Sequence, residues 1–372
     1  MPRHVNHAAF LVALVALSGC TQPQQELTEE QELGKRLFND QSLSTPPGQA
    51  CVDCHSPAAG FADPLTELPV SRGARHGRFG SRNDLTAAYA SFIGPLVLDT
   101  ASGTYSGGLF WDGRANSLEE QAQGPPLNPL EMANPDAGAV VEQLRHGPHA
   151  AMFAKVYGTD ALAEPDRAFD LMAKAIAAYE RSRELNSFSS KYDAYLRGET
   201  ALSTEEELGL RIFEDPARGN CAACHPSRPG EDGAPPLFTD HTYDNLGIPP
   251  NPENPFYYLD RELNPAGPAF VDLGLGAVVH DQAQNGKFRV PTLRNVAITP
   301  PYMHNGIFRT LREVVVFYST RDVGPWPAPE VPDNVNTDEL GNLGLSQEGI
   351  DALVAFMQSL TDGYRPGGER HE

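Results

Sequence analysis

Four of the five cysteines in the sequence lie in two short motifs, Cys51–His55 and Cys221–His225, and both motifs read C-x-x-C-H. This spacing is typical of covalent c-type haem attachment. Two thiols one helical turn apart can bond the two vinyl groups of one haem, and the adjacent histidine can ligate its iron. The sequence therefore predicts two haem c groups. The predicted cofactor-binding residues are Cys51, Cys54, His55, Cys221, Cys224 and His225.

Other uses of paired cysteines explain these motifs less well. A zinc ribbon places its cysteine pairs closer together in the chain, and it needs no histidine directly after both pairs. A thioredoxin-like redox pair would need one motif within a βαβ unit. Disulfides in an exported protein would leave His55 and His225 unexplained.

The fifth cysteine, Cys20, follows a segment that predicts export. The apolar stretch at residues 8–17 has the length of a signal-peptide core and is too short to span a bilayer. It continues into Leu-Ser-Gly-Cys, which resembles a bacterial lipobox, although an ordinary signal peptide with a chance cysteine is the alternative. We expect a signal peptide at 1–19, a lipidated Cys20 and a tether at 20–30. Thr21 then favours the outer membrane, on the periplasmic side, with the lipid as the only membrane anchor.

The composition limits the remaining classes of function. A chain of 372 residues suggests two domains. The 34 glycines and 33 prolines favour a loop-rich architecture. The net charge of −21 argues against binding to nucleic acid, which needs a basic surface. Because the only long apolar run is near the amino terminus, the chain is not expected to be an integral channel or transporter.

An internal repeat precedes the two cysteine motifs. Residues 32–40 and 207–215 share the pattern E-L-G-x-R-apolar-F-x-D. Thr28 and Ser203 stand before them with the spacing of a capping box, so a short helix is predicted to lead into each haem loop. The repeat indicates a duplicated cytochrome c domain rather than one domain with two unrelated motifs.

The expected fold is therefore mostly α, with few strands. We place the amino-terminal haem domain at 31–199 and the carboxy-terminal haem domain at 200–372. Apolar residues at helical spacing predict a helix after Pro165, which closes the first half, and another that begins at Ser346 and ends at Gly363.

Five further segments resemble the bacterial di-haem cytochrome c peroxidase and MauG superfamily, and the resemblance extends from about Glu32 to Gly363. It implies two tandem class-I-like cytochrome c domains related by a pseudo-twofold, with the haems facing a shared interface. It also implies an open, peroxide-reactive haem in the first half and a six-coordinate haem in the second. The segments are Phe110–Arg114, Ser117–Ala122, Gly124–Met132, Arg289–Asn295 and Pro301–Gly306.

The same resemblance assigns three residues to catalysis. It places Trp111 between the haems, and Gln121 and Glu131 over the open iron. A carboxylate within reach of peroxide can carry a proton from one oxygen to the other, and a carboxamide can orient peroxide without adding charge. The alternatives are a solvated surface acid for Glu131 and a core aromatic for Trp111.

The upper ligand of the second iron separates two branches of the superfamily. The candidates are Met303, His304, His280, Met357 and Tyr318. Thr310 is predicted to cap a helix whose apolar face includes Tyr318, so this side chain is expected to point inward. By the resemblance, Tyr318 falls where peroxidases place an axial methionine and MauG-type proteins a tyrosine. We favour Tyr318 as ligand and the MauG-like branch, with an ordinary core tyrosine as the alternative.

The resemblance also implies a calcium ion between the haems, held by Asn83, Thr299 and Pro301. One departure limits the comparison. MauG has a surface tryptophan just before its second haem motif, where this chain has Gly219 and Asn220. The role of Trp326 and the question of whether His76 ligates the first iron are left open.

The sequence thus predicts an oxidoreductase that reacts with hydrogen peroxide at the amino-terminal haem. It would oxidise a partner through the carboxy-terminal haem, and that partner would be a small cytochrome, a cupredoxin or a protein substrate. One alternative is a conventional cytochrome c peroxidase fed by a small periplasmic cytochrome. A non-catalytic electron carrier is the other, although Gln121 and Glu131 would then be superfluous.

Overall fold

The computed structural model describes residues 26–230 and 233–365. The predicted signal peptide, the lipidation site Cys20 and the start of the tether lie outside the described residues, so these assignments stay predictions. No helix in the described part of the chain is long and apolar enough to cross a membrane.

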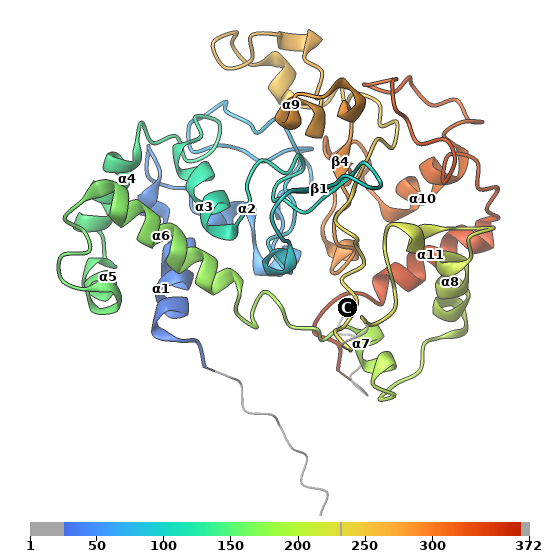
Figure 1. Ribbon diagram of the computed structural model, residues 1–372, viewed down its shortest axis with the longest axis horizontal. Helices are drawn as coiled ribbons and strands as arrows, with labels where there is room; N and C mark the ends of the chain where they lie inside the picture. The colour runs from blue at the N-terminus through green and yellow to red at the C-terminus, as the bar shows by residue number, and fades with distance from the viewer. Residues whose placement is uncertain (1–25, 231–232, 366–372) are drawn as a thin grey trace, which may run out of the picture.

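Helices and long connecting loops make up most of the molecule (Figure 1), which confirms the expected mostly α, loop-rich class. Two small antiparallel sheets accompany them: β1 (Val97–Asp99) pairs with β2 (Thr104–Ser106), and β3 (Tyr243–Asp244) with β4 (Phe288–Arg289). The helices are α1 (Glu29–Phe38), α2 (Cys51–Cys54), α3 (Leu118–Leu127), α4 (Ala137–His146), α5 (Ala150–Tyr157), α6 (Pro165–Glu180), α7 (Lys191–Leu196), α8 (Thr204–Glu214), α9 (Leu275–Val279), α10 (Leu311–Thr320) and α11 (Gln347–Gln358).

The predicted helix starts are confirmed. Capping boxes form at Thr28, Ser203 and Thr310, where each side chain accepts a hydrogen bond from the backbone three residues later. The last helix, α11, ends at Gln358 rather than at the predicted Gly363. The chain leaves the helix there because Asn295 bonds both the Leu360 carbonyl and Asp362.

Two hydrophobic clusters form the core. The first is built mainly from α1, α4, α5 and α6, and the second from α8, α10 and α11. Figure 1 shows these two groups of helices at opposite sides of the molecule, with α7 between them. Tyr192 in α7 packs in the second cluster. The domain boundary at residue 199 itself stays a prediction.

The glycine of the sequence repeat lies where two helices cross at close range. A Cβ at Gly34 of α1 would stand 1.8 Å from the Ala175 carbonyl oxygen of α6. In the second half, a Cβ at Gly209 of α8 would stand 2.0 Å from the Ala352 carbonyl oxygen of α11. The shared E-L-G pattern therefore encodes the same helix crossing twice.

A buried arginine joins the two halves. The Arg294 side chain is 1% exposed and pairs with both oxygens of Asp193, at 3.0 and 2.9 Å. Its guanidinium carbon also lies 4.9 Å from the ring centre of Tyr89 and 4.4 Å from that of Phe188, both in the first cluster. The Arg294 guanidinium thus holds the aromatic rings of the first cluster against the second half of the chain.

The helix crossing gives a first prediction. Gly209→Ala should destabilise the protein by about 1–3 kcal/mol, because the added methyl group overlaps the α11 backbone. Alanine's better helix propensity, worth about 1 kcal/mol, would only partly offset this. The control is Gly349→Ala in α11, whose added Cβ would meet its nearest heavy atom at 3.4 Å, an ordinary contact. Thermal unfolding followed by circular dichroism measures both, and equal midpoints for the two variants would contradict the crossing argument.

Candidate functional site

The first C-x-x-C-H motif lines a cavity of about 390 Å³. Helix α2 carries Cys51 and Cys54 one turn apart, and His55 ends it by donating its backbone N–H to the Cys51 carbonyl. The His55 Nδ1 atom lies 3.1 Å from the Phe61 carbonyl oxygen, which leaves Nε2 for an iron. Burial lowers the pKa of His55, so the imidazole is neutral, as a metal ligand must be.

The second motif repeats this arrangement in a cavity of about 180 Å³. A short 3₁₀ turn carries Cys221, and the His225 Nδ1 atom lies 2.7 Å from the Phe238 carbonyl oxygen. Burial lowers the pKa of His225 as well. All four cysteines are free of disulfides. Each cavity therefore offers two thiols and one oriented imidazole, the donor set that haem c requires.

Trp111 lines both cavities. Its indole Nε1 donates to the Asn83 carbonyl oxygen at 2.8 Å, and its own carbonyl accepts from the Arg289 N–H at 2.8 Å. Asn83 in turn donates its backbone N–H to the His304 carbonyl at 2.7 Å. The indole is thus fixed by the first half of the chain, and the backbone of the same residue is fixed by the second half.

Arg289 lines both cavities too, and it is only 4% exposed. Its Nε donates to the Phe110 carbonyl at 3.1 Å, but no carboxylate among residues 26–230 and 233–365 pairs with it. Burial lowers its pKa to about 10. A buried cation without a counter-charge can pair with the carboxylate groups of haem. Together with the thiols and the imidazole in each cavity, Arg289 therefore makes the residues present fit two haem groups. Sequence reasoning placed Arg289 in a family segment without a role, because burial without a partner leaves no sequence signal.

The two predicted peroxide-handling residues meet in the first cavity. Gln121 reaches it from α3 and Glu131 from the loop after α3. A Glu131 carboxylate oxygen accepts from Asn128 Nδ2 at 2.7 Å. Burial and the negative charge of Asp84 raise the pKa of Glu131 to about 7. A carboxyl group with this pKa can both accept and return a proton near neutral pH.

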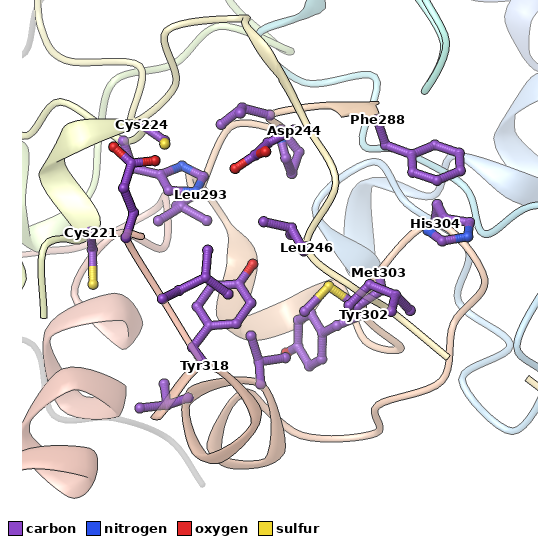
Figure 2. A pocket seen from close by; sticks show the side chains of 18 of the residues that line it. Cys221, Cys224, Asp244, Leu246, Phe288, Leu293, Tyr302, Met303, His304 and Tyr318 are labelled. Atoms are coloured by element: carbon purple, nitrogen blue, oxygen red, sulfur yellow. The ribbon is translucent and has the colours of Figure 1, made fainter. Parts of the chain in front are cut away.

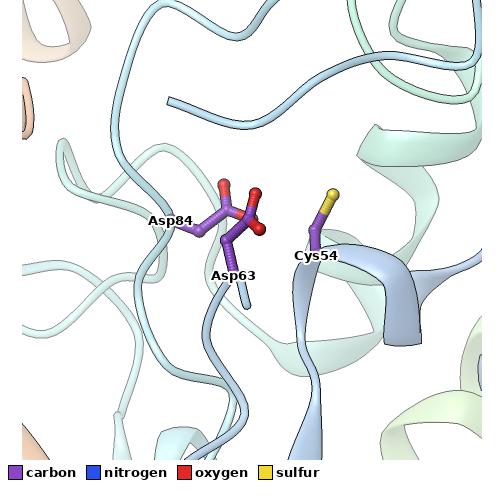
Figure 3. Close-up of side chains that lie close together, drawn as sticks. All are labelled: Cys54, Asp63 and Asp84. Atoms are coloured by element: carbon purple, nitrogen blue, oxygen red, sulfur yellow. The ribbon is translucent and has the colours of Figure 1, made fainter. Parts of the chain in front are cut away.

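A second acidic group lies beside the first haem motif and was not found from the sequence. Ligand atoms of Cys54, Asp63 and Asp84 lie within 4.8 Å of one another (Figure 3). The Ser71 hydroxyl donates to Asp63, and burial and the charge of Asp63 raise the pKa of Asp84 to about 7. We assign no metal to this cluster, because Cys54 bonded to haem would have no thiolate to offer.

Tyr318 reaches the second cavity from α10, and Figure 2 shows its hydroxyl pointing into that cavity. Burial and the neighbouring Cys224 raise the pKa of Tyr318. Within the described residues, the hydroxyl has no hydrogen-bond partner from the protein. Of the other axial candidates, Met303, His304 and Met357 also line the cavity, whereas His280 is exposed and does not.

Of the three predicted calcium ligands, Asn83 contacts Trp111 directly, through its carbonyl oxygen. Asn83 donates its side-chain Nδ2 to the Pro69 carbonyl at 3.1 Å. The Asn83 Oδ1 atom and the carbonyls of Thr299 and Pro301 accept no hydrogen bond from the part of the chain that is described. These oxygens are thus available to a cation, and the calcium assignment stays a prediction. His76 is exposed and does not line the first cavity.

A buried ion-pair network fixes the segment that carries Trp111. Arg82 donates to Asp272 at 2.6 and 2.8 Å and to Asp112 at 2.6 Å. Asp112 follows Trp111 directly, whereas Asp272 belongs to the second half. Burial alone would raise the pKa of Asp272, but the Arg82 guanidinium outweighs it and lowers the pKa to about 2. The network therefore connects the segment that carries Trp111 to the second half of the chain.

Comparison with known proteins identifies the family. A sequence profile described as di-haem cytochrome c peroxidase matches residues 28–201. The methylamine utilization protein MauG of Paracoccus denitrificans is 42% identical over 349 residues, covering 89% of this chain and 88% of that protein. The chain belongs to the di-haem cytochrome c peroxidase and MauG family.

Two further relatives support this assignment. Cytochrome c551 peroxidase of Pseudomonas aeruginosa is 33% identical over 316 residues, covering 84% of this chain and 78% of that protein. The crystal structure of the diheme peroxidase BthA from Burkholderia thailandensis matches with a TM-score of 0.78 at 33% identity, covering 91% of this chain and 87% of that one. Family membership confirms the two cytochrome c-like domains, the two haems c and a peroxidase-type oxidoreductase that uses peroxide and a redox partner.

The Arg82 network gives a second prediction, on pH. The folded-state pKa of Asp272 is depressed, so its contribution to stability is present above the unfolded pKa of about 3.9 and is lost as the pH falls toward 2. Asp272→Asn should cost about 3 kcal/mol near neutral pH, since a buried ion pair is broken while Asp112 still faces Arg82. The difference in the free energy of unfolding between the variant and the unmodified protein should become smaller as the pH falls below ~4.

Thermal unfolding across this pH range measures the effect. Asp260→Asn, at an exposed position without an ion pair, is the matched control. If Asp272→Asn and the unmodified protein differed in stability by the same amount at every pH, the charge of Asp272 would not contribute to stability.

Proposed function

We propose that the protein is a MauG-like di-haem oxidoreductase that reacts with hydrogen peroxide in the first cavity and oxidises a redox partner through the second. One observation carries this proposal: a single indole, Trp111, lines both cavities, and only the first cavity also contains Gln121 and Glu131. An asymmetric pair joined by an oxidisable ring suits chemistry at one centre and electron exchange at the other.

The chain's own groups would divide the work as follows. When bound, each haem supplies an iron that exchanges electrons with peroxide or with a partner. Glu131 takes the proton from one peroxide oxygen and returns it to the other, and its bond from Asn128 holds the carboxylate in place. Gln121 orients the peroxide by hydrogen bonding. Trp111, held at both ends by backbone groups, carries electrons between the two centres.

Tyr318 supports the MauG-like branch. Its hydroxyl enters the second cavity and has no hydrogen-bond partner among residues 26–230 and 233–365, as expected of an axial ligand. A phenolate oxygen favours oxidised iron, whereas a thioether favours reduced iron. Met303 lines the same cavity, and this observation favours the second candidate, a conventional cytochrome c peroxidase with axial sulfur.

Two further assignments belong to this proposal. Calcium bound by Asn83, Thr299 and Pro301 would hold the halves together beside Trp111, through the hard oxygen atoms that this ion prefers. The amino-terminal motif supports export to the periplasm and lipid anchoring through Cys20. The electron donor or protein substrate would be a small cytochrome, a cupredoxin or another redox protein.

The third prediction tests peroxide chemistry at the first cavity. Glu131→Gln should slow peroxide consumption by about a hundredfold or more, because the proton carrier is lost. In the unmodified protein the carboxylate forms as the pH rises through about 7, so the rate should rise there, and the variant should lose this rise. Stopped-flow spectroscopy measures both. The exposed Glu164→Gln is the control, and undiminished consumption by Glu131→Gln would exclude the proposed role.

The fourth prediction tests the axial ligand. Tyr318→Met and Tyr318→Ala should each change the low-spin ferric EPR signal and leave the high-spin signal of the first haem intact. The unmodified diferric protein should develop a long-lived near-infrared band on adding peroxide, and the Tyr318→Met variant should not. Tyr258→Met, on an exposed tyrosine, is the control. Identical spectra for Tyr318→Met and the unmodified protein would remove Tyr318 as a ligand.

A further inference from the structure

Trp326 lies at the surface end of a group of aromatic rings that begins at the second cavity. The indole is partly exposed, in a loop that follows α10. Its ring centre is 5.1 Å from that of Phe317 and 5.8 Å from that of Phe308, and both contacts are edge-to-face. Phe317 and Phe308 are themselves 5.0 Å apart and buried. The three rings therefore form one packed unit.

This unit touches the proposed axial ligand. Phe317 precedes Tyr318 in α10, and their ring centres are 6.3 Å apart. Tyr318 lines the second cavity and packs against the same small cluster as Trp326. Ring contacts thus continue from the cavity to the partly exposed indole, which gives an electron a short route through packed atoms.

Hydrogen bonds and loop chemistry fix the indole in this position. Its Nε1 donates to the Thr320 hydroxyl at 3.0 Å, and that hydroxyl donates to the Val316 carbonyl at 2.7 Å. Proline on each side of Trp326 restricts the backbone. A Cβ at Gly324 would stand 3.1 Å from the indole nitrogen, so glycine leaves room for the ring.

The Thr320 contact also determines what happens to the indole proton. A hydroxyl is a hydrogen-bond acceptor but a very weak base, so it cannot remove the N–H proton when the ring loses an electron. The indole would be oxidised as a cation radical and return to its starting state on gaining an electron. Such a group transfers electrons without proton movement.

We propose that Trp326 is the electron-entry residue of the second haem, a role that rests on the proposed function, in which peroxide reacts at the first haem and a redox partner is oxidised through the second. The indole gives one electron through Phe317 and Tyr318 to the peroxide-oxidised haem pair, and a reduced one-electron protein donor then returns an electron to the indole. Two such transfers and two protons reduce one hydrogen peroxide to two water molecules. Gly219 and Asn220, directly before the second haem motif, offer no aromatic ring for this role.

The test uses the full-length holoprotein, hydrogen peroxide and a reduced small soluble cytochrome c as donor. W326F keeps an aromatic ring against Phe317 but raises its oxidation energy, so oxidation of the donor should become about tenfold slower. W326Y, which restores an oxidisable ring, should recover part of the rate. V323A changes the same exposed loop without touching a redox-active group and should behave like the unmodified protein.

A second readout does not depend on turnover with the donor. Unmodified protein treated with peroxide alone should gain oxygen at Trp326, detected by peptide mass spectrometry, because the oxidised indole then has no donor. Absence of oxygen at this residue would overturn the proposal even if W326F failed to fold. Equal donor oxidation by W326F and unmodified protein, or an equal loss in V323A and W326F, would also overturn it. Failure of the unmodified protein to consume peroxide would instead refute the proposed function, and the relay with it.

Discussion

The structure depends on how one indole is held between two cavities. Trp111 is held from both sides, because the Asn83 carbonyl accepts from its indole nitrogen and the Arg289 N–H donates to its backbone carbonyl. The buried network of Arg82 with Asp112 and Asp272 then fixes the adjacent backbone to the second half. Electron exchange between two centres falls steeply with separation, so a scaffold that fixes the intervening ring also fixes the coupling between the cavities.

Much of the fold could be predicted from local signals. The residue pairs at Thr28, Ser203 and Thr310 locate three helix starts, because a capping box is read within four residues. The repeat predicts duplication, but the reason for its glycine is a contact with a helix more than a hundred residues away. The end of α11 was predicted too late, since the residues after it bond to distant Asn295: Asn295 donates to the Leu360 carbonyl and accepts from the Asp362 N–H.

The site divides in the same way. The two C-x-x-C-H motifs predict haem attachment by themselves, and the segments that resemble the family predicted roles for Trp111, Gln121 and Glu131. Arg289, Asp63 and Asp84 were missed because their importance depends on their neighbours in the fold. Arg289 is a buried cation with no carboxylate partner in the described part of the chain, and folding brings the two aspartates together. A single sequence shows which residues can ionise but not which of them are buried beside one another.

The unpaired charge of Arg289 has a consequence for maturation. Closing the two halves around empty cavities would bury a guanidinium that no carboxylate of the described residues balances, at a considerable electrostatic cost. Carboxylates of a porphyrin attached beside Arg289 would balance this charge, so we expect the closed arrangement to become more favourable once the cofactors are bound. Cofactor loading would then precede docking of the two halves.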